Sequence, residues 1–268
     1  MTPSIRFHWR SVGDPENPAV LFLHGFMGSC NDWQPIAEAL ADQFYCVAVD
    51  LPGHGGTAVD GSDSLYRMEA GAEALVKWME QKSVHHPHCV GYSMGGRVAL
   101  YLAVRHGNHF RTFIIESGSP GLASEAERAE RRKKDEKLAS RLEEESLEQF
   151  IGEWYEQPLF ASLRTDPQRY VTLVHRRLRN NPHGLATSLR RMGTGVQPSL
   201  WDRLNSISKP TLLIVGAADD KFKAIAKQMA LANAGFEVTA IANAGHNVHL
   251  ERPGQYIAVL REFMSKYR

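Results

Sequence analysis

The stretch His88-Cys89-Val90-Gly91-Tyr92-Ser93-Met94-Gly95-Gly96-Arg97 holds the pattern Gly-x-Ser-x-Gly between a short apolar run and a helix-compatible run. In a strand–turn–helix context this pattern predicts a nucleophile elbow, a sharp turn that lifts the serine side chain above a sheet. The turn leaves little room for a Cβ on either side of the serine, which is why glycines flank it. The start of the next helix also favours developing negative charge. We therefore predict that Ser93 is a reacting hydroxyl.

Composition and charge narrow the class of protein. With 268 residues and 43% hydrophobic content, the chain is long enough to bury one large core. Its net charge of +1 gives no reason to expect nucleic acid or a membrane as a partner, and no run approaches bilayer length. The three cysteines are widely spaced and form no C-x-x-C motif, so we expect reduced thiols, no metal site and a cytoplasmic location.

Short apolar runs alternate with helix-compatible segments along most of the chain. The runs cover residues 19–23, 45–49, 88–90, 112–115, 211–215 and 237–241. Strands that alternate with helices predict an α/β fold with a mostly parallel central sheet and helices on both faces. A last helix is predicted at about residues 254–266, directly after a proline.

The alternation of strands and helices stops between residues 121 and 204. A highly charged segment, residues 125–145, carries both signs at helical spacings. We predict a helical cap at 121–204, inserted into a core made of 1–120 and 205–268. An insertion at this point lies above the carboxyl ends of the strands, where ligands bind, so the cap should cover Ser93.

A serine hydroxyl needs a base to take its proton and an acid to orient that base. His246 is the preferred base, because it lies between the last predicted strand and the last predicted helix; His249 is its nearest rival. Asp219 and Asp220 both follow the strand at 211–215 and give the chain order serine, acid, histidine. Glu116, at the end of another predicted strand, is a less favoured acid. From the residues alone, the choice between the two aspartates stays open.

A second loop can supply hydrogen-bond donors for a developing oxyanion. Leu23-His24-Gly25-Phe26 ends a predicted strand near the N-terminus. We predict that the backbone N–H groups of Phe26 and Met94 converge on one substrate oxygen. His24 is interpreted as a structural side chain that holds this loop.

Taken together, these motifs resemble the α/β-hydrolase superfamily over nearly the whole chain. More narrowly, the chain resembles the 2-succinyl-6-hydroxy-2,4-cyclohexadiene-1-carboxylate synthases (MenH) of menaquinone and phylloquinone biosynthesis. The narrower resemblance rests on residues 91–99, 119–122, 127–131, 154–160, 180–184 and 219–222. It implies an α/β-hydrolase fold and a lyase that eliminates pyruvate from 2-succinyl-5-enolpyruvyl-6-hydroxy-3-cyclohexene-1-carboxylate, a small tricarboxylate. It also implies a Ser-His-Asp triad acting as general base, with Asp219 as the acid and with no cofactor. We expect a monomer.

The charge of the predicted cap supports an anionic substrate independently. Residues 157–205 contain eight arginines and only two acidic residues. Several cations placed for bidentate contacts suit a substrate with carboxylates. The resemblance assigns these contacts to Arg97, Arg131 and Arg179, with Tyr92 and Trp154 lining the site.

Two other functions would use the same residues. A serine hydrolase of an acidic ester, thioester or carbon–carbon bond would use Ser93 as a nucleophile, and an acyl-serine adduct would reveal it. A receptor built on the same fold would bind a ligand and turn over slowly. The complete set of triad and oxyanion residues argues against a receptor.

Overall fold

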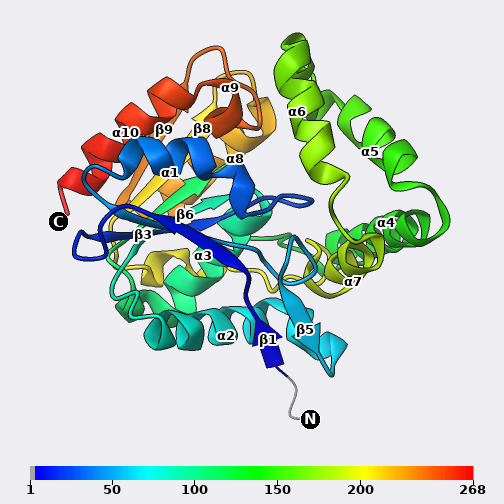
Figure 1. The fold of residues 1–268 in the computed structure, drawn as a ribbon, viewed down its shortest axis with the longest axis horizontal. Coiled ribbons are helices and arrows are strands. Elements are labelled where there is room, and N and C mark those ends of the chain that lie inside the picture. Colours follow the sequence, from blue (N-terminus) through cyan, green and yellow to red (C-terminus); the bar gives the residue numbers. More distant parts are fainter. Residues whose placement is uncertain (1–3, 268) are drawn as a thin grey trace.

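The computed structural model describes residues 4–267 and has a central sheet with helices on both faces and a separate group of helices at one side (Figure 1). The seven-stranded sheet has the order β2-β4-β3-β6-β7-β8-β9. Its strands are β2 (Trp9–Val12), β3 (Ala19–Leu23), β4 (Tyr45–Val49), β6 (His88–Tyr92), β7 (Thr112–Glu116), β8 (Thr211–Gly216) and β9 (Phe236–Ile241). The edge strand β2 is antiparallel to β4, and the other neighbours are parallel. A small two-stranded sheet pairs β1 (Ser4–Arg6) with β5 (Ala58–Asp60).

The central strands are apolar throughout because helices cover both faces of the sheet. In β3, Val20 and Phe22 belong to the hydrophobic cluster on one face, and Leu21 and Leu23 to the cluster on the other. Side chains of α1 and α10 complete the first cluster, and side chains of α2, α3 and α8 complete the second. The predicted α/β class with a mostly parallel sheet is therefore confirmed.

The helices fall into two groups. Those packed on the sheet are α1 (Gln34–Leu40), α2 (Met68–Gln81), α3 (Met94–His106), α8 (Asp220–Ala232), α9 (Val248–Glu251) and α10 (Pro253–Ser265). Those that follow β7 as a separate group are α4 (Glu125–Glu144), α5 (Leu147–Glu156), α6 (Pro167–Arg177) and α7 (Pro182–Met192). Short 3₁₀ turns connect these elements: η1 (Cys30–Asp32), η2 (Asp63–Tyr66), η3 (Gly107–His109), η4 (Pro158–Phe160), η5 (Ser162–Thr165) and η6 (Trp201–Ser206).

The group α4–α7 has a hydrophobic cluster of its own. Phe150, Tyr155 and Leu185 are buried in it, and Met27 joins it from the loop after β3. The charged helix α4 begins at a capping box, in which the Ser124 side chain accepts from the backbone N–H of the third helical residue. The predicted cap boundaries at residues 121 and 204 stay a prediction.

Buried polar contacts tie α6 and α7 to loops of the sheet. The Asn180 amide, between the two helices, donates to the carbonyl of Met27 (2.8 Å) and accepts from the backbone N–H of Gly55 (3.3 Å). Arg177, at the end of α6, forms a buried ion pair with Asp32 at 2.8 Å. Because unpaired buried polar groups are costly, these contacts hold the helices firmly to the loops after β3 and β4.

The six strands and the last helix predicted from the sequence all form, with ends that differ by at most two residues. The elements β1, β2 and β5 escaped prediction because they are short and none of their residues is buried. Among residues 4–267, no helix combines the length and the apolar character needed to span a membrane.

Candidate active site

Ser93 lies at the predicted elbow, between β6 and α3. Its backbone has φ of 50°, which is strained for a residue with a Cβ. A Cβ added to Gly91 would come within 2.3 Å of the Gly95 carbonyl oxygen, and one added to Gly95 within 2.1 Å of the Leu23 carbonyl oxygen. The flanking glycines are therefore required by close approach of backbone, while the serine itself carries the unusual dihedral angle.

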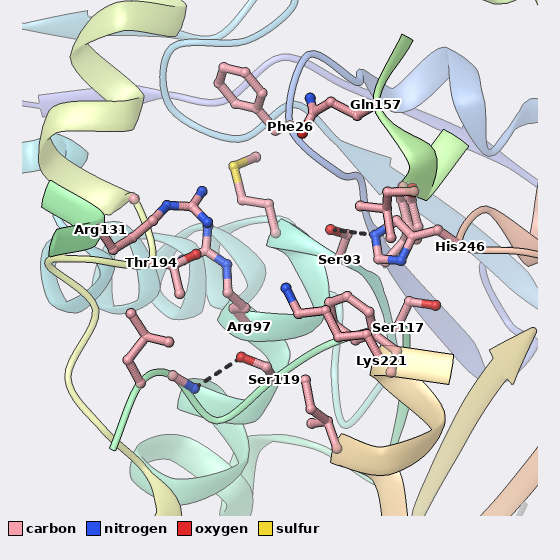
Figure 2. Close-up of a pocket in the computed structure, with 18 of the residues that line it drawn as sticks. Phe26, Ser93, Arg97, Ser117, Ser119, Arg131, Gln157, Thr194, Lys221 and His246 are labelled. Carbon is pink, nitrogen blue, oxygen red and sulfur yellow. Dashed lines mark hydrogen bonds between the residues drawn. The ribbon is translucent and has the colours of Figure 1, made fainter. Parts of the chain in front are cut away.

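Ser93, His246 and Asp219 form a hydrogen-bonded chain. The Ser93 hydroxyl donates to Nε2 of His246 over 3.2 Å, as the dashed line in Figure 2 shows. Nδ1 of His246 donates in turn to Oδ2 of Asp219 over 2.7 Å. The histidine and the aspartate are 2% and 6% exposed, so this relay is shielded from water. Such a chain can move a proton from the serine to the imidazole and stabilise the imidazolium.

The structure separates the two candidate aspartates. Asp219 caps α8, where its Oδ1 accepts from the backbone N–H of Phe222, and its other oxygen meets His246. The Asp220 side chain is 93% exposed and pairs with Lys223. Asp219 is therefore the aspartate placed to orient the histidine.

His249 and Glu116, the less favoured base and acid of the sequence analysis, pair with each other. Nδ1 of His249 lies 2.8 Å from Glu116 Oε2, and the backbone N–H of His249 donates to the same carboxylate. Both side chains are buried, and the His249 ring stacks on Trp33 with 4.3 Å between centroids. This second pair lies behind the site, because the Tyr92 ring contacts both His249 and His246.

The loop after β3 is shaped around His24. Its Nδ1–H donates to the Gly25 carbonyl (2.7 Å), and its Nε2 accepts from the backbone N–H of Leu51 (2.9 Å). Burial lowers the pKa of His24, which favours the neutral ring that these two contacts require. Phe26, in this loop, and Met94, the first residue of α3, both line the cavity around Ser93. Because Met94 is the first residue of α3, its backbone N–H has no carbonyl one turn earlier in the helix to donate to. This N–H is therefore available to bind an oxyanion.

A cavity of about 460 Å³ opens above Ser93 between the sheet and the group α4–α7. Tyr92 and Trp154, which the resemblance assigns to the site, both line this cavity. Trp154 of α5 packs against Phe26 with ring centroids 5.3 Å apart, so the group α4–α7 meets the loop after β3 at the cavity. This volume accommodates a small molecule.

Arg97 and Arg131 bring positive charge into the cavity side by side (Figure 2). Nη1 of Arg97 donates to the carbonyl of Met192 and to Oε1 of Gln197, each at 2.9 Å, while Nε of Arg131 donates to Asp135 at 2.6 Å. Burial and the neighbouring Arg131 lower the pKa of Arg97 to about 10. Two adjacent cations at the wall of a cavity are suited to hold an anionic group.

Arg179 is not brought to the cavity. Its side chain is exposed, and the residue is absent from the cavity lining, whereas Arg177, two positions earlier, lines the cavity. Arg177 is the last residue of α6 and is buried, whereas Arg179 lies in the turn beyond the helix, so the two arginines have different surroundings. Arg177 escaped prediction because its partner Asp32 is 145 residues away in the sequence.

One group of side chains outside the cavity has the composition of a metal site. Ligand atoms of His8, Cys30 and Asp50 lie within 4.8 Å of one another. The Asp50 carboxylate already accepts from the backbone N–H groups of Cys30 and Gly56. Burial raises the pKa of the Cys30 thiol to about 12, so without a metal the sulfur stays protonated. We interpret this group as hydrogen-bonded support for the turn after β4.

The elbow, the triad and the sheet order define an α/β-hydrolase. A model of the alpha/beta hydrolase fold family matches residues 18–253. The chain is 38% identical over 255 residues to 2-succinyl-6-hydroxy-2,4-cyclohexadiene-1-carboxylate synthase of Escherichia coli O1:K1, covering 94% of this chain and 96% of that protein. A solved structure titled MenH from S. aureus superposes with a TM-score of 0.89 at 32% identity, covering 99% of each chain.

A plant relative is much longer. The chain is 36% identical over 277 residues to protein PHYLLO, chloroplastic, of Arabidopsis thaliana, and matches 98% of its own length but 16% of the plant protein. Within the α/β-hydrolase fold, this chain therefore belongs to the family of the 2-succinyl-6-hydroxy-2,4-cyclohexadiene-1-carboxylate synthases.

Proposed function

We propose that this chain is a lyase that eliminates pyruvate from 2-succinyl-5-enolpyruvyl-6-hydroxy-3-cyclohexene-1-carboxylate and leaves 2-succinyl-6-hydroxy-2,4-cyclohexadiene-1-carboxylate. The observation that carries the proposal is the hydrogen-bonded chain Ser93–His246–Asp219 opening into a cavity whose wall holds two adjacent arginines. The Escherichia coli O1:K1 relative is named as the synthase of this product.

The proposed reaction needs a base and an oxyanion site. Ser93 passes its proton to His246 and then takes the proton α to the ketone of the substrate. The electron pair left on carbon enters the enolate, whose oxygen binds the backbone N–H groups of Phe26 and Met94. The pair then shifts across the ring alkene and breaks the carbon–oxygen bond. The leaving group departs as the enolate of pyruvate and takes at carbon the proton that His246 holds, which returns Ser93 and His246 to their starting protonation states; no water is consumed and no covalent intermediate forms.

The charge of the cavity suits this substrate. The substrate carries three carboxylates, and the guanidinium groups of Arg97 and Arg131 can each form two parallel hydrogen bonds to a carboxylate. An ordinary esterase pocket would be more apolar. The helices α4–α7 then act as a cap that keeps the anion and excludes water while the enolate forms.

Pyruvate release is the decisive measurement. Purified protein mixed with the enolpyruvyl substrate, with pyruvate coupled to lactate dehydrogenase, should oxidise NADH in proportion to substrate consumed. Ser93→Ala should abolish this signal while its thermal unfolding stays that of a folded protein. Near-full activity in Ser93→Ala would remove the elbow from the mechanism.

The hydrolase alternative predicts a different intermediate. A serine nucleophile would leave a mass increase on Ser93 after rapid quenching with the substrate, and a burst of product in the first turnover. General-base elimination leaves neither. We further propose that the protein works as a monomer in the cytoplasm, where its three buried cysteines stay reduced.

A further inference from the structure

The cavity wall contains four cations, which differ in how far neighbouring carboxylates neutralise them. Arg97, Arg131, Arg177 and Lys221 all line the cavity. Arg177 is held in its buried ion pair with Asp32. Arg131 gives one nitrogen to the Asp135 carboxylate and keeps its other two for a ligand. The guanidinium of Arg97 meets neutral oxygens only, among the hydrogen bonds of the described chain.

Lys221 has no such neutralising partner. Within residues 4–267 its ammonium forms no ion pair, and its one specific contact is with the Phe222 ring, whose centroid lies 5.5 Å from Nζ. The nearby Asp220 carboxylate is taken by Lys223, at 2.7 Å. Lys221 also occupies the first turn of α8, where the helix dipole disfavours a cation. The Lys221 side chain is exposed and its ammonium is not paired with a carboxylate of the described chain, so its charge is available to an anion in the cavity.

Lys221 reaches the cavity from a different wall than the arginines do. Figure 2 shows Arg131 on the side of the cap helices and Lys221 entering from the start of α8, and Ser93 lines the same cavity. The lysine follows the triad acid Asp219 by two residues, and its neighbour Phe222 packs on His246 with centroids 4.6 Å apart. An anion at Lys221 would therefore lie close to the reacting atoms.

We propose that Lys221 binds the substrate carboxylate that Arg97 and Arg131 leave free, and so sets selectivity for a tricarboxylate. The inference rests on the proposed elimination of pyruvate. Three carboxylates spread around one ring need cations on more than one wall of the cavity. With Arg179 outside the cavity and Arg177 neutralised, Lys221 is the cation that remains on the second wall.

The test compares three variants by steady-state kinetics of pyruvate release. Lys221→Met should raise KM by about tenfold, the effect of losing one charge-assisted hydrogen bond in an open cavity, while kcat changes far less. Lys221→Arg should restore most of the affinity. Lys227→Met is the matched control, because Lys227 is an exposed lysine of the same helix outside the cavity lining, and its KM should equal that of the unmodified protein.

Product inhibition then identifies the carboxylate. If Lys221→Met weakens inhibition by pyruvate alone, the lysine holds the carboxylate of the leaving group. If it weakens inhibition by the cyclohexadiene product alone, the lysine holds a carboxylate of the ring system. Either outcome supports the assignment.

Three results would overturn it: an unchanged KM in Lys221→Met, an equal rise in Lys227→Met, or a failure of Lys221→Arg to restore affinity. The unmodified protein separates this inference from the proposed function. If it releases pyruvate and Lys221→Met keeps its KM, the lysine assignment alone falls. If it releases no pyruvate, the proposed function falls first.

Discussion

Replacing His249 by phenylalanine tests whether the buried pair behind the site holds the molecule together. The Glu116 carboxylate is fully buried and accepts from Nδ1 and from the backbone N–H of His249. Phenylalanine keeps the ring stacked on Trp33 but removes Nδ1. The carboxylate would then keep only the backbone donor of that residue, and breaking a buried pair in this way costs about 3 to 5 kcal/mol.

The assay is thermal and urea unfolding followed by circular dichroism. For a chain of this size, such a loss lowers the melting temperature by about 10 °C. Glu116→Gln should cost less, about 1 to 2 kcal/mol, because the neutral amide can still accept from His249. The double variant Glu116→Leu/His249→Phe leaves no buried charge and should be more stable than the sum of its single changes predicts. A loss below about 1 kcal/mol in His249→Phe, or strict additivity in the double variant, would refute this reasoning.

The other predictions concern the site and the acid stability of the fold. Arg97→Ala should weaken substrate binding by about 2 to 5 kcal/mol, seen as a higher KM for the tricarboxylate; unchanged kinetics would rule out its contact with a carboxylate. Asp219→Asn should lower kcat by roughly 10⁴-fold, because His246 loses its orienting acceptor, whereas Asp220→Asn should keep nearly full activity; equal losses would contradict the assignment of the acid. Burial lowers the pKa of His54 and of His88 from 6.5 to about 3, so the folded state excludes protons that the unfolded state binds between these values. The stability that these rings contribute is complete above about pH 6.5 and is lost as pH falls, by roughly 2.7 kcal/mol per pH unit near pH 5 for both together. In urea unfolding, His88→Asn should remove about half of this slope, and an unchanged slope would exclude His88 as a source.

The sequence was sufficient for the parts of the fold that local pattern controls. Buried parallel strands are apolar along their whole length, so β3 and β4 could be placed to the residue. The elbow could be recognised because its glycines and serine are adjacent in the chain. The strands β1, β2 and β5 lack such a pattern, since each is short and none of their residues is buried; β1 and β5 pair only with each other.

The candidate site shows where local pattern stops being informative. Asp219 and Asp220 are adjacent and chemically identical, and only the path of the chain into α8 turns one toward His246 and the other to solvent. Arg177 and Arg179 carry the same charge two positions apart, but α6 ends at Arg177, and only the folded chain turns Arg177 into the cavity and leaves Arg179 exposed. The charge excess of the cap could be counted in advance, whereas the choice of which cations face the ligand required tertiary structure.

The hydrogen bonds of Asn180 limit how freely the cap of this enzyme can be exchanged for the cap of a relative. Asn180, in the segment after α6, donates to the Met27 carbonyl, one residue beyond the predicted oxyanion donor Phe26. It also accepts from the backbone N–H of Gly55, in the turn after β4. A cap taken from a distant relative would lack these two hydrogen bonds. Its exchange would therefore loosen the loop that carries the predicted oxyanion donor Phe26, as well as the cap itself. Chimeric proteins should therefore keep activity only when the segments 24–32 and 50–56 are exchanged together with the cap.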